Sequence, residues 1–395
     1  MQKITSLEIY LKFKPESIVE TESLEDVGCG IYPCYYIKCE NKLKVSTSVI
    51  SLIIDSGTFE INHNFKPPDF LKEYLSEVRL YFRSIPILNK LFKLPWYSTW
   101  ETIDKRIKKL KSFEKVTLTD TQILFNPDFT INNEELIINR SAYYIKKFIN
   151  DIERIFPDYS HIVLTGGRDS QIINLVLKLN SKNWYIFSAQ PNYPLVKRWV
   201  EKNGINVNRI FTHDGRNEES SEDFKKKVIC GDLYADPRHI KWMPTIKKIT
   251  EEFNDKCIFW GGTMSSPAHF YTGKHRGYIE KDKTTFFNNH FEKTASWLGN
   301  YHQVFKNFTG SPYLSPYHSP EIWSELYQHF DPAVITKNAD LRMKIGDRLF
   351  EKPVWWLSEN PGPKPYTYNF YINCYEMYLK YINEMVGQGR DDIVS

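Results

Sequence analysis

The spacing of apolar and polar positions divides the chain into two regions. Before residue 126, apolar and polar residues alternate in short runs, as in "YYIKCENKLKVSTSVISLII" (35–54) and "KVTLTDTQILFNP" (115–127). Alternation with a period of two is typical of half-buried strands, and "CENK" has the composition of a turn. Both runs therefore predict strands, two of them in the first run. "PPDFLKEYLSEVRLYFRSI" (67–85) has helical spacing, so we predict a small β-rich α+β domain over residues 1–125.

The pattern changes after "NPDFTINNEELI" (126–137), which has the composition of a junction. An amphipathic helix is predicted over 138–156, and further helices over 239–253 and 319–330. Between them, short buried strands alternate with helices: "HIVLTGG" (161–167), "RDSQIINLVLKLN" (168–180), "NWYIFSAQ" (183–190), "YPLVKRWVEKNG" (193–204) and "NRIFTHDG" (208–215). Such alternation is typical of a parallel sheet with crossover helices, so residues 126–395 are predicted to form an α/β domain.

Composition narrows the class of protein. The 395 residues are 41% hydrophobic and 25% charged, with a net charge of +4, which is typical of a soluble protein and argues against a nucleic-acid partner. The densest basic run, "KRIKKLK" (105–111), is interpreted as a solvated flank of a helix or strand, with a polyanion-binding patch as the alternative. No run is long enough for a membrane span, and the start of the chain lacks a signal-peptide pattern. We predict a cytoplasmic protein in which Cys29, Cys34 and Cys39 are free, buried thiols.

The turn "TGGRDS" between the first of these strands and its helix carries the candidate chemistry. Gly166 and Gly167 allow the backbone to bend and to approach an anion, and the N–H groups at the start of the helix point towards it. Thr165 and Ser170 offer hydroxyl groups, Arg168 offers a positive charge and Asp169 offers a magnesium ligand. The alternative is an ordinary glycine turn in which Asp169 and Ser170 cap the helix.

"LTGGRDSQ" resembles the pyrophosphate loop of the N-type ATP pyrophosphatases, whose usual form is Ser-Gly-Gly-x-Asp-Ser, with Thr165 in place of the first serine. The wider chain is similar to asparagine synthetase, the β-lactam synthetases and the lasso-peptide cyclases over residues 98–120, 311–326 and 340–356. The resemblance implies a parallel-sheet ATP-pyrophosphatase domain preceded by a shortened glutaminase-like domain. It also implies that Leu164 and Ser188 lie near the nucleotide base.

Three departures from these relatives matter. The glutaminase nucleophile would be a cysteine at position 2, where this chain has Gln2, so the resemblance implies that the amine does not come from glutamine. The relatives' acidic Gly-Glu-Gly-x-Asp-Glu loop is replaced by "GGTMSS", in which Gly261 and Gly262 still offer backbone N–H groups. Magnesium would therefore depend on Asp169 together with Asp232 or Asp236, although a helix cap or a loop charge explains the last two equally well. The relatives' catalytic lysine corresponds to one of Lys344, Lys352 and Lys364.

The resemblance implies an ATP-dependent synthetase that adenylates a carboxylate, releases pyrophosphate and couples the acyl group to an amine. ATP and Mg²⁺ are the expected cofactors. The carboxylate and amine would belong to small molecules or peptides in natural-product maturation, with a precursor peptide or partner protein as further candidates. The alternatives are a sugar- or RNA-modifying enzyme with the same loop, and an ATP-binding subunit without catalytic activity.

Overall fold

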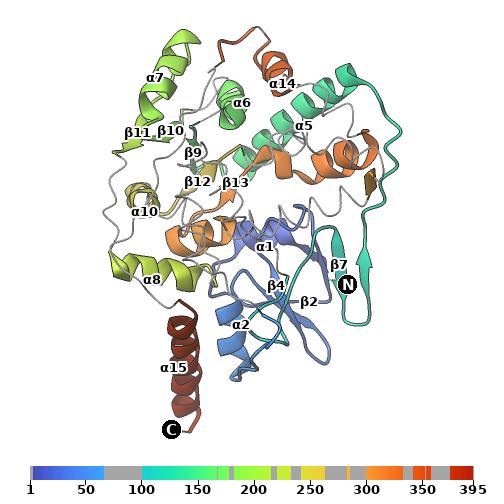
Figure 1. The fold of residues 1–395 in the computed structure, drawn as a ribbon, viewed down its shortest axis with the longest axis vertical. Helices are drawn as coiled ribbons and strands as arrows, with labels where there is room; N and C mark the ends of the chain where they lie inside the picture. The colour runs from blue at the N-terminus through green and yellow to red at the C-terminus, as the bar shows by residue number, and fades with distance from the viewer. Residues whose placement is uncertain are drawn as a thin grey trace, which may run out of the picture.

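A five-stranded parallel sheet forms the centre of the protein (Figure 1). The computed structural model describes residues 3–65, 100–166, 168–177, 182–214, 220–232, 242–262, 283–284, 299, 301–331, 341–351, 353–356 and 374–394. The strands are β9 (Ser160–Leu164), β10 (Trp184–Ala189), β11 (Ile210–His213), β12 (Cys257–Trp260) and β13 (Tyr313–Leu314). They lie in the order β11-β10-β9-β12-β13, with Ile162 of β9 between Tyr185 and Phe259. The predicted α/β arrangement with a parallel sheet is confirmed.

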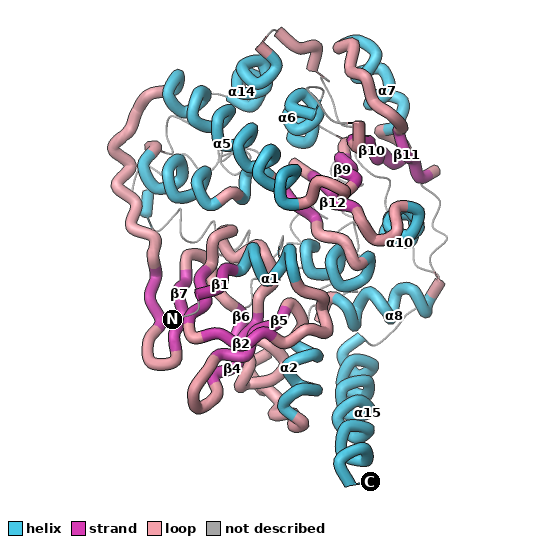
Figure 2. Tube along the Cα trace, turned by 180° about the vertical axis from the view of Figure 1, so that it is seen from behind, coloured by secondary structure: helices cyan, strands magenta, loops and turns pink. Residues whose placement is uncertain are grey.

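Alternate side chains of these strands enter separate apolar cores, as the pleat requires. Val163 and Ile186 face helices on one side, while Ile162, Phe187 and Phe259 face those on the other. The first layer contains α5 (Glu134–Ile155), α6 (Arg168–Leu177), α7 (Tyr193–Lys202) and α14 (Leu341–Phe350); the second contains α8 (Ser221–Cys230), α10 (Met243–Glu252) and helical residues 301–309. Figure 2 shows the same layers from behind.

Most of the predicted helices of this region are confirmed. The helix predicted over 138–156 begins earlier, because the Asn133 side chain caps Leu136 N–H and starts α5 at Glu134. The helices predicted after the first two strands of the sheet are α6 and α7, and the one predicted over 239–253 is α10. Of the helix predicted over 319–330, residues 320–329 are helical, around the π-helical segment η3 (Ile322–Tyr327), which follows the short 3₁₀ helix η2 (Pro316–His318).

The amino-terminal region contains two four-stranded sheets, in the orders β1-β3-β7-β8 and β2-β5-β4-β6. Their strands are β1 (Lys3–Thr5), β2 (Val19–Thr21), β3 (Ser23–Glu25), β4 (Tyr35–Lys38), β5 (Leu43–Ser46), β6 (Lys108–Lys109), β7 (Glu114–Thr117) and β8 (Thr121–Ile123). Helix α1 (Ser6–Lys12) begins at a capping box made by Thr5 and Glu8. The strands predicted in 35–54 are confirmed as far as residue 46, and the prediction in 115–127 is confirmed by β7 and β8. The helix predicted in 67–85 lies outside the described residues.

One expectation for the amino-terminal region is wrong, and a second fails at a single residue. The apolar run after β5 forms a helix, α2 (Val49–Ser56), because Ser48 caps its start and Gly57, at a φ of 63°, ends it. Within "KRIKKLK", Lys109 is not solvated: it is 4% exposed, and its ammonium group lies 5.4 Å from the centre of the Trp100 ring. Burial lowers the pKa of Lys109 to about 8, although the nearby Asp232 acts in the opposite direction.

The two regions share their cores. Tyr10 of α1 and Ile31 and Tyr32 of the loop before β4 pack in one apolar cluster with Ile145 of α5 and Leu314 of β13. The carboxyl-terminal helix α15 (Cys374–Val394) packs against α2 and α8 through Tyr378 and Ile382 and then extends away from the rest of the protein (Figures 1 and 2). Among the helices that the structure describes, none has the length and apolar character to cross a membrane.

Candidate functional site

The order of the central sheet defines a switch point between β9 and β12. From β9 the chain proceeds to β10 and β11 on one side, and from β12 it proceeds to β13 on the other. In open parallel sheets, ligands bind outside the carboxyl ends of the strands at such a point, because the loops there diverge and leave a crevice. The predicted "TGGRDS" turn follows β9 and the predicted pair Gly261 and Gly262 follows β12, so the structure brings both to this point.

The first residues of the turn are held firmly against the sheet. Thr165 is 4% exposed, its N–H donates to the Phe187 carbonyl at 3.0 Å, and its hydroxyl accepts a bond of 2.8 Å from the Ser170 hydroxyl. Leu164 ends β9, and its side chain packs on the face of the sheet opposite to α6. The structure thus joins Thr165 and Ser170, two predicted site residues, across the start of α6.

Gly166 is a point of close approach. A Cβ atom on this residue would lie 2.6 Å from the side-chain nitrogen of Asn192, so glycine lets the turn pass directly beside the start of α7. Arg168 and Asp169 belong to the first turn of α6, where backbone N–H groups have no helical acceptor. Gly167 and the side chains of Arg168 and Asp169 lie outside the described residues, so their predicted roles stay predictions.

At the end of β12, Gly261 allows a second close approach. Its N–H donates to the Leu314 carbonyl at 2.9 Å, and a Cβ atom there would lie 1.5 Å from the Tyr313 hydroxyl oxygen. No side chain fits without moving Tyr313, whose own N–H donates to the Tyr10 hydroxyl. Gly262 follows within the described residues, and the "TMSS" that comes next lies outside them.

Three further polar residues lie around the turn, and we refer to Gln171, Ser188 and Asn192 as the polar shelf. Gln171 is fully buried and Ser188 is 1% exposed. Among the residues that the structure describes, no hydrogen-bond partner reaches the Ser188 hydroxyl, either polar atom of the Gln171 amide, or Asn192 Oδ1. Ser188 was predicted as a site residue, whereas Gln171 and Asn192 were missed. In the sequence, Gln171 lies four positions before the buried Leu175, and Asn192 lies four positions before the buried Val196. This spacing is the signal that could have found them.

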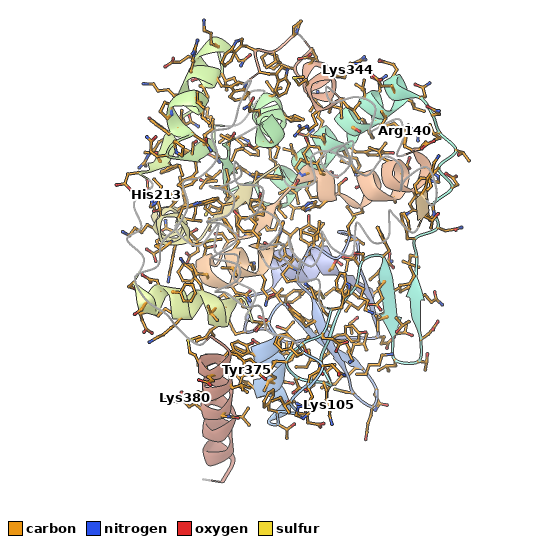
Figure 3. The ribbon with its side chains drawn as sticks, in the orientation of Figure 1. Lys105, Arg140, His213, Lys344, Tyr375 and Lys380 are labelled. Atoms are coloured by element: carbon orange, nitrogen blue, oxygen red, sulfur yellow. The ribbon has the colours of Figure 1, made fainter. Side chains whose placement is uncertain are left out.

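The predicted lysines are only partly described. Lys344 lies on α14, 47% exposed, and forms an ion pair of 2.5 Å with Glu134 at the start of α5. Figure 3 shows it well separated from His213, which marks the carboxyl end of β11. Lys344 therefore takes part in a surface ion pair, and the catalytic role of this lysine stays a prediction. Lys352 and Lys364 lie outside the described residues.

Asp232 is a buried carboxylate at a junction of distant parts of the chain. It is 3% exposed and lies where the two regions of the chain meet α15. Its carboxylate accepts bonds from Val49 N–H at 3.0 Å, from the Tyr378 hydroxyl at 2.7 Å and from the Gln303 amide. Burial raises its pKa to about 6, while these donors act in the opposite direction. Asp232 is therefore not an exposed loop charge, and through Val49 its carboxylate caps the start of α2.

The described residues do not assemble a magnesium site, since no three or more histidine, cysteine, aspartate or glutamate side chains among them converge on one point. The predicted ligands, the Asp169 side chain and Asp236, are outside this part of the chain. Of the free thiols, Cys29 and Cys34 are buried as predicted, and Cys39 is partly exposed. Burial raises the pKa of Cys29 well above its ordinary value, so it is not an activated nucleophile.

Comparison with known proteins adds no relative. No family model matches the chain, and a search of the curated proteins gives no match. What the structure defines is thus a class: an α/β protein with a five-stranded parallel sheet and a glycine turn at its switch point.

Proposed function

We propose that the protein is an ATP-dependent synthetase that activates a carboxylate as its acyl-adenylate and couples it to an amine. The observation that carries the proposal is the position of the turn containing Thr165, Gly166 and Ser170 between β9 and α6, at the switch point of the sheet. Its resemblance to the pyrophosphate loop of the N-type ATP pyrophosphatases supplies the finer fold and the reaction type.

The reaction follows from the weakness of a carboxylate as an electrophile. A carboxylate oxygen attacks the α-phosphorus of ATP, and the bond to pyrophosphate breaks. The amine nitrogen then attacks the acyl carbon, AMP leaves with the former carboxylate oxygen, and the amine proton passes to solvent. The protein contributes mainly by holding the reactants in position and by stabilising the departing charge.

The residues of the turn suit the departing pyrophosphate. Gly166 presents backbone without a side chain, and the N–H groups in the first turn of α6, which have no acceptor within the helix, attract an anion. Thr165 and Ser170 are already joined through their hydroxyls, which fixes both beside the loop. Asp169 and Asp236 stay the predicted magnesium ligands, and a bound Mg²⁺ would offset the charge of the phosphates.

The amino-terminal region supports a substrate-borne amine. Glutamine hydrolysis by a cysteine needs a reactive thiolate, and Cys29 and Cys34 of this region are fully buried, which raises the pKa of both thiols. We therefore propose that the amine belongs to the substrate itself or to a second small molecule or peptide.

Exchange of labelled pyrophosphate into ATP tests this function. The purified protein, ATP and Mg²⁺ are incubated with pools of amino acids, peptides and other carboxylates, and label in ATP is measured. We expect exchange that depends on one class of carboxylate, and a loss of at least about 100-fold in Asp169→Asn. Asp151→Asn, which changes a surface aspartate of α5 in an ion pair with Lys147, is the matched control and should retain exchange.

Two results would contradict the proposal. If ATP binds but no carboxylate supports exchange, the protein is an ATP-binding subunit without this activity. If exchange depends on transfer RNA or a sugar instead, the shared loop serves another reaction class.

A further inference from the structure

The polar shelf continues an apolar core towards the ligand end of the sheet. Leu175, Ile186 and Val196 pack together between α6, β10 and α7. Gln171 lies four residues before Leu175, on the same face of α6, and Ser188 lies two residues after Ile186, on the same face of β10.

Asn192 completes this arrangement on the third element. It lies four residues before Val196, one helical turn towards the start of α7, and its amide is close to Gly166. Each of the three residues thus lies nearer to the carboxyl ends of the strands than the apolar residue that it is paired with here, by one helical turn or by two strand residues. They face the same space between α6 and α7, directly beside the turn after β9.

The chemistry of this space is neutral. The shelf offers a carboxamide with a donor and an acceptor, a second carboxamide oxygen and a hydroxyl group, and its three residues carry no formal charge. A phosphate would instead favour cations and clustered N–H groups, which the start of α6 provides. Leaving a buried polar atom unpaired costs folding free energy, so several of them together indicate a ligand group that satisfies them.

We propose that Gln171 is the residue that selects the base of the nucleotide, with Asn192 and Ser188 as its partners; this rests on the proposed use of ATP. The 6-amino group of adenine has two hydrogens, which match the two amide oxygens of Gln171 and Asn192. The adjacent ring nitrogen accepts from the Gln171 amide nitrogen. A purine with a 6-oxo group would place a lone pair against the Asn192 oxygen and is disfavoured.

Access to the shelf requires a local movement, because Gln171 is fully buried. Gly166 lies close to the Asn192 amide, since a Cβ atom on it would meet the amide nitrogen. Asn192 is only partly buried, so it is the member of the shelf that a nucleotide would reach first.

Calorimetric titration in the presence of Mg²⁺ tests the assignment with three probes: ATP, inosine triphosphate and inorganic pyrophosphate. The wild type should bind ATP about 10- to 100-fold more tightly than inosine triphosphate, which differs in the groups that the shelf would contact. Gln171→Leu should reduce this ratio to about 3-fold or less while the affinity for pyrophosphate is unchanged. Gln171→Met gives the same comparison if the leucine variant does not fold.

The control is Gln303→Leu, which alters a second fully buried glutamine of the described residues, at the junction around Asp232. It should retain the preference for ATP. If the wild type binds ATP and pyrophosphate but does not discriminate between the two bases, or if both Gln171 variants keep the full ratio, the assignment of Gln171 is wrong and the proposed function stands. If neither ATP nor pyrophosphate binds to the wild type, the proposed function itself fails.

Discussion

Two buried polar clusters in this protein differ in whether their groups are paired. At the junction, Asp232 accepts bonds from Val49, Gln303 and Tyr378, which belong to distant parts of the chain. At the polar shelf, Gln171 and Ser188 are buried to the same degree, and within the described residues nothing pairs with their side chains. We infer that the junction stabilises the fold, and we propose that the shelf receives another molecule.

The largest expected effect comes from breaking the junction. Asp232→Ala should lower the free energy of unfolding by about 3–5 kcal/mol, because three buried donors lose their acceptor. Urea denaturation followed by tryptophan fluorescence measures it. Glu222→Ala, which removes only a surface ion pair on α8, should cost less than about 0.5 kcal/mol. Equal losses in the two variants would show that the junction does not hold the regions together.

The two buried glutamines provide the sharpest comparison. Gln303→Leu should lower the free energy of unfolding by about 1–3 kcal/mol, since Tyr35 and Asp232 lose their partner. Gln171→Leu should leave it unchanged or raise it by up to about 1 kcal/mol without nucleotide, because it removes unpaired polar atoms. A loss in Gln171→Leu as large as that in Gln303→Leu would mean that Gln171 serves the fold.

The pH should change the stability that the junction around Asp232 provides, and the sign of the change follows from its pKa. Burial raises the pKa of Asp232 from 3.8 to about 6, so between these values the folded protein holds a proton that the unfolded chain releases. The contribution of Asp232 to the free energy of unfolding is therefore complete below pH 4 and is lost as the pH rises through 6. Between pH 4.5 and 7, the free energy of unfolding of the wild type should fall by about 1–3 kcal/mol relative to that of Asp232→Asn.

Denaturation of both proteins across this range measures the difference. Asp26, whose pKa burial raises to about 6, and His161, whose pKa burial lowers to about 4, titrate in both proteins and cancel. Parallel curves for wild type and variant would show that Asp232 does not titrate as its burial requires.

The smallest effect is expected at the surface. Lys344→Ala removes a half-exposed ion pair with Glu134 and should change the free energy of unfolding by less than about 0.5 kcal/mol. If the ion pair is its whole role, pyrophosphate exchange is unchanged and the catalytic lysine is Lys352 or Lys364. A large loss of exchange with unchanged stability would assign the reaction to Lys344 instead.

The parallel sheet could be predicted from the sequence because its signals are local. Each of β9, β10 and β11 is a short apolar run followed by a helix with its own periodicity, and the glycine turn lies between two such elements. The position of the turn at the switch point needed only the general rule for parallel sheets.

The errors have long-range or competing causes. The β-branched run at 49–54 suggested a strand, but the Ser48 cap and Gly57 outweighed that propensity and made α2. Lys109 is buried against Trp100, which no local pattern could reveal. Gln171 and Asn192 were missed because their proximity depends on the packing of α6, β10 and α7 together.

The central claim is that the turn after β9 seats the pyrophosphate part of ATP. A crystal structure of the protein soaked with ATP and Mg²⁺ tests it most directly. The account predicts the β- and γ-phosphates against Gly166 and the start of α6, with the base towards Gln171 and Ser188. Triphosphate bound at another strand end, or a turn closed against nucleotide, would contradict it.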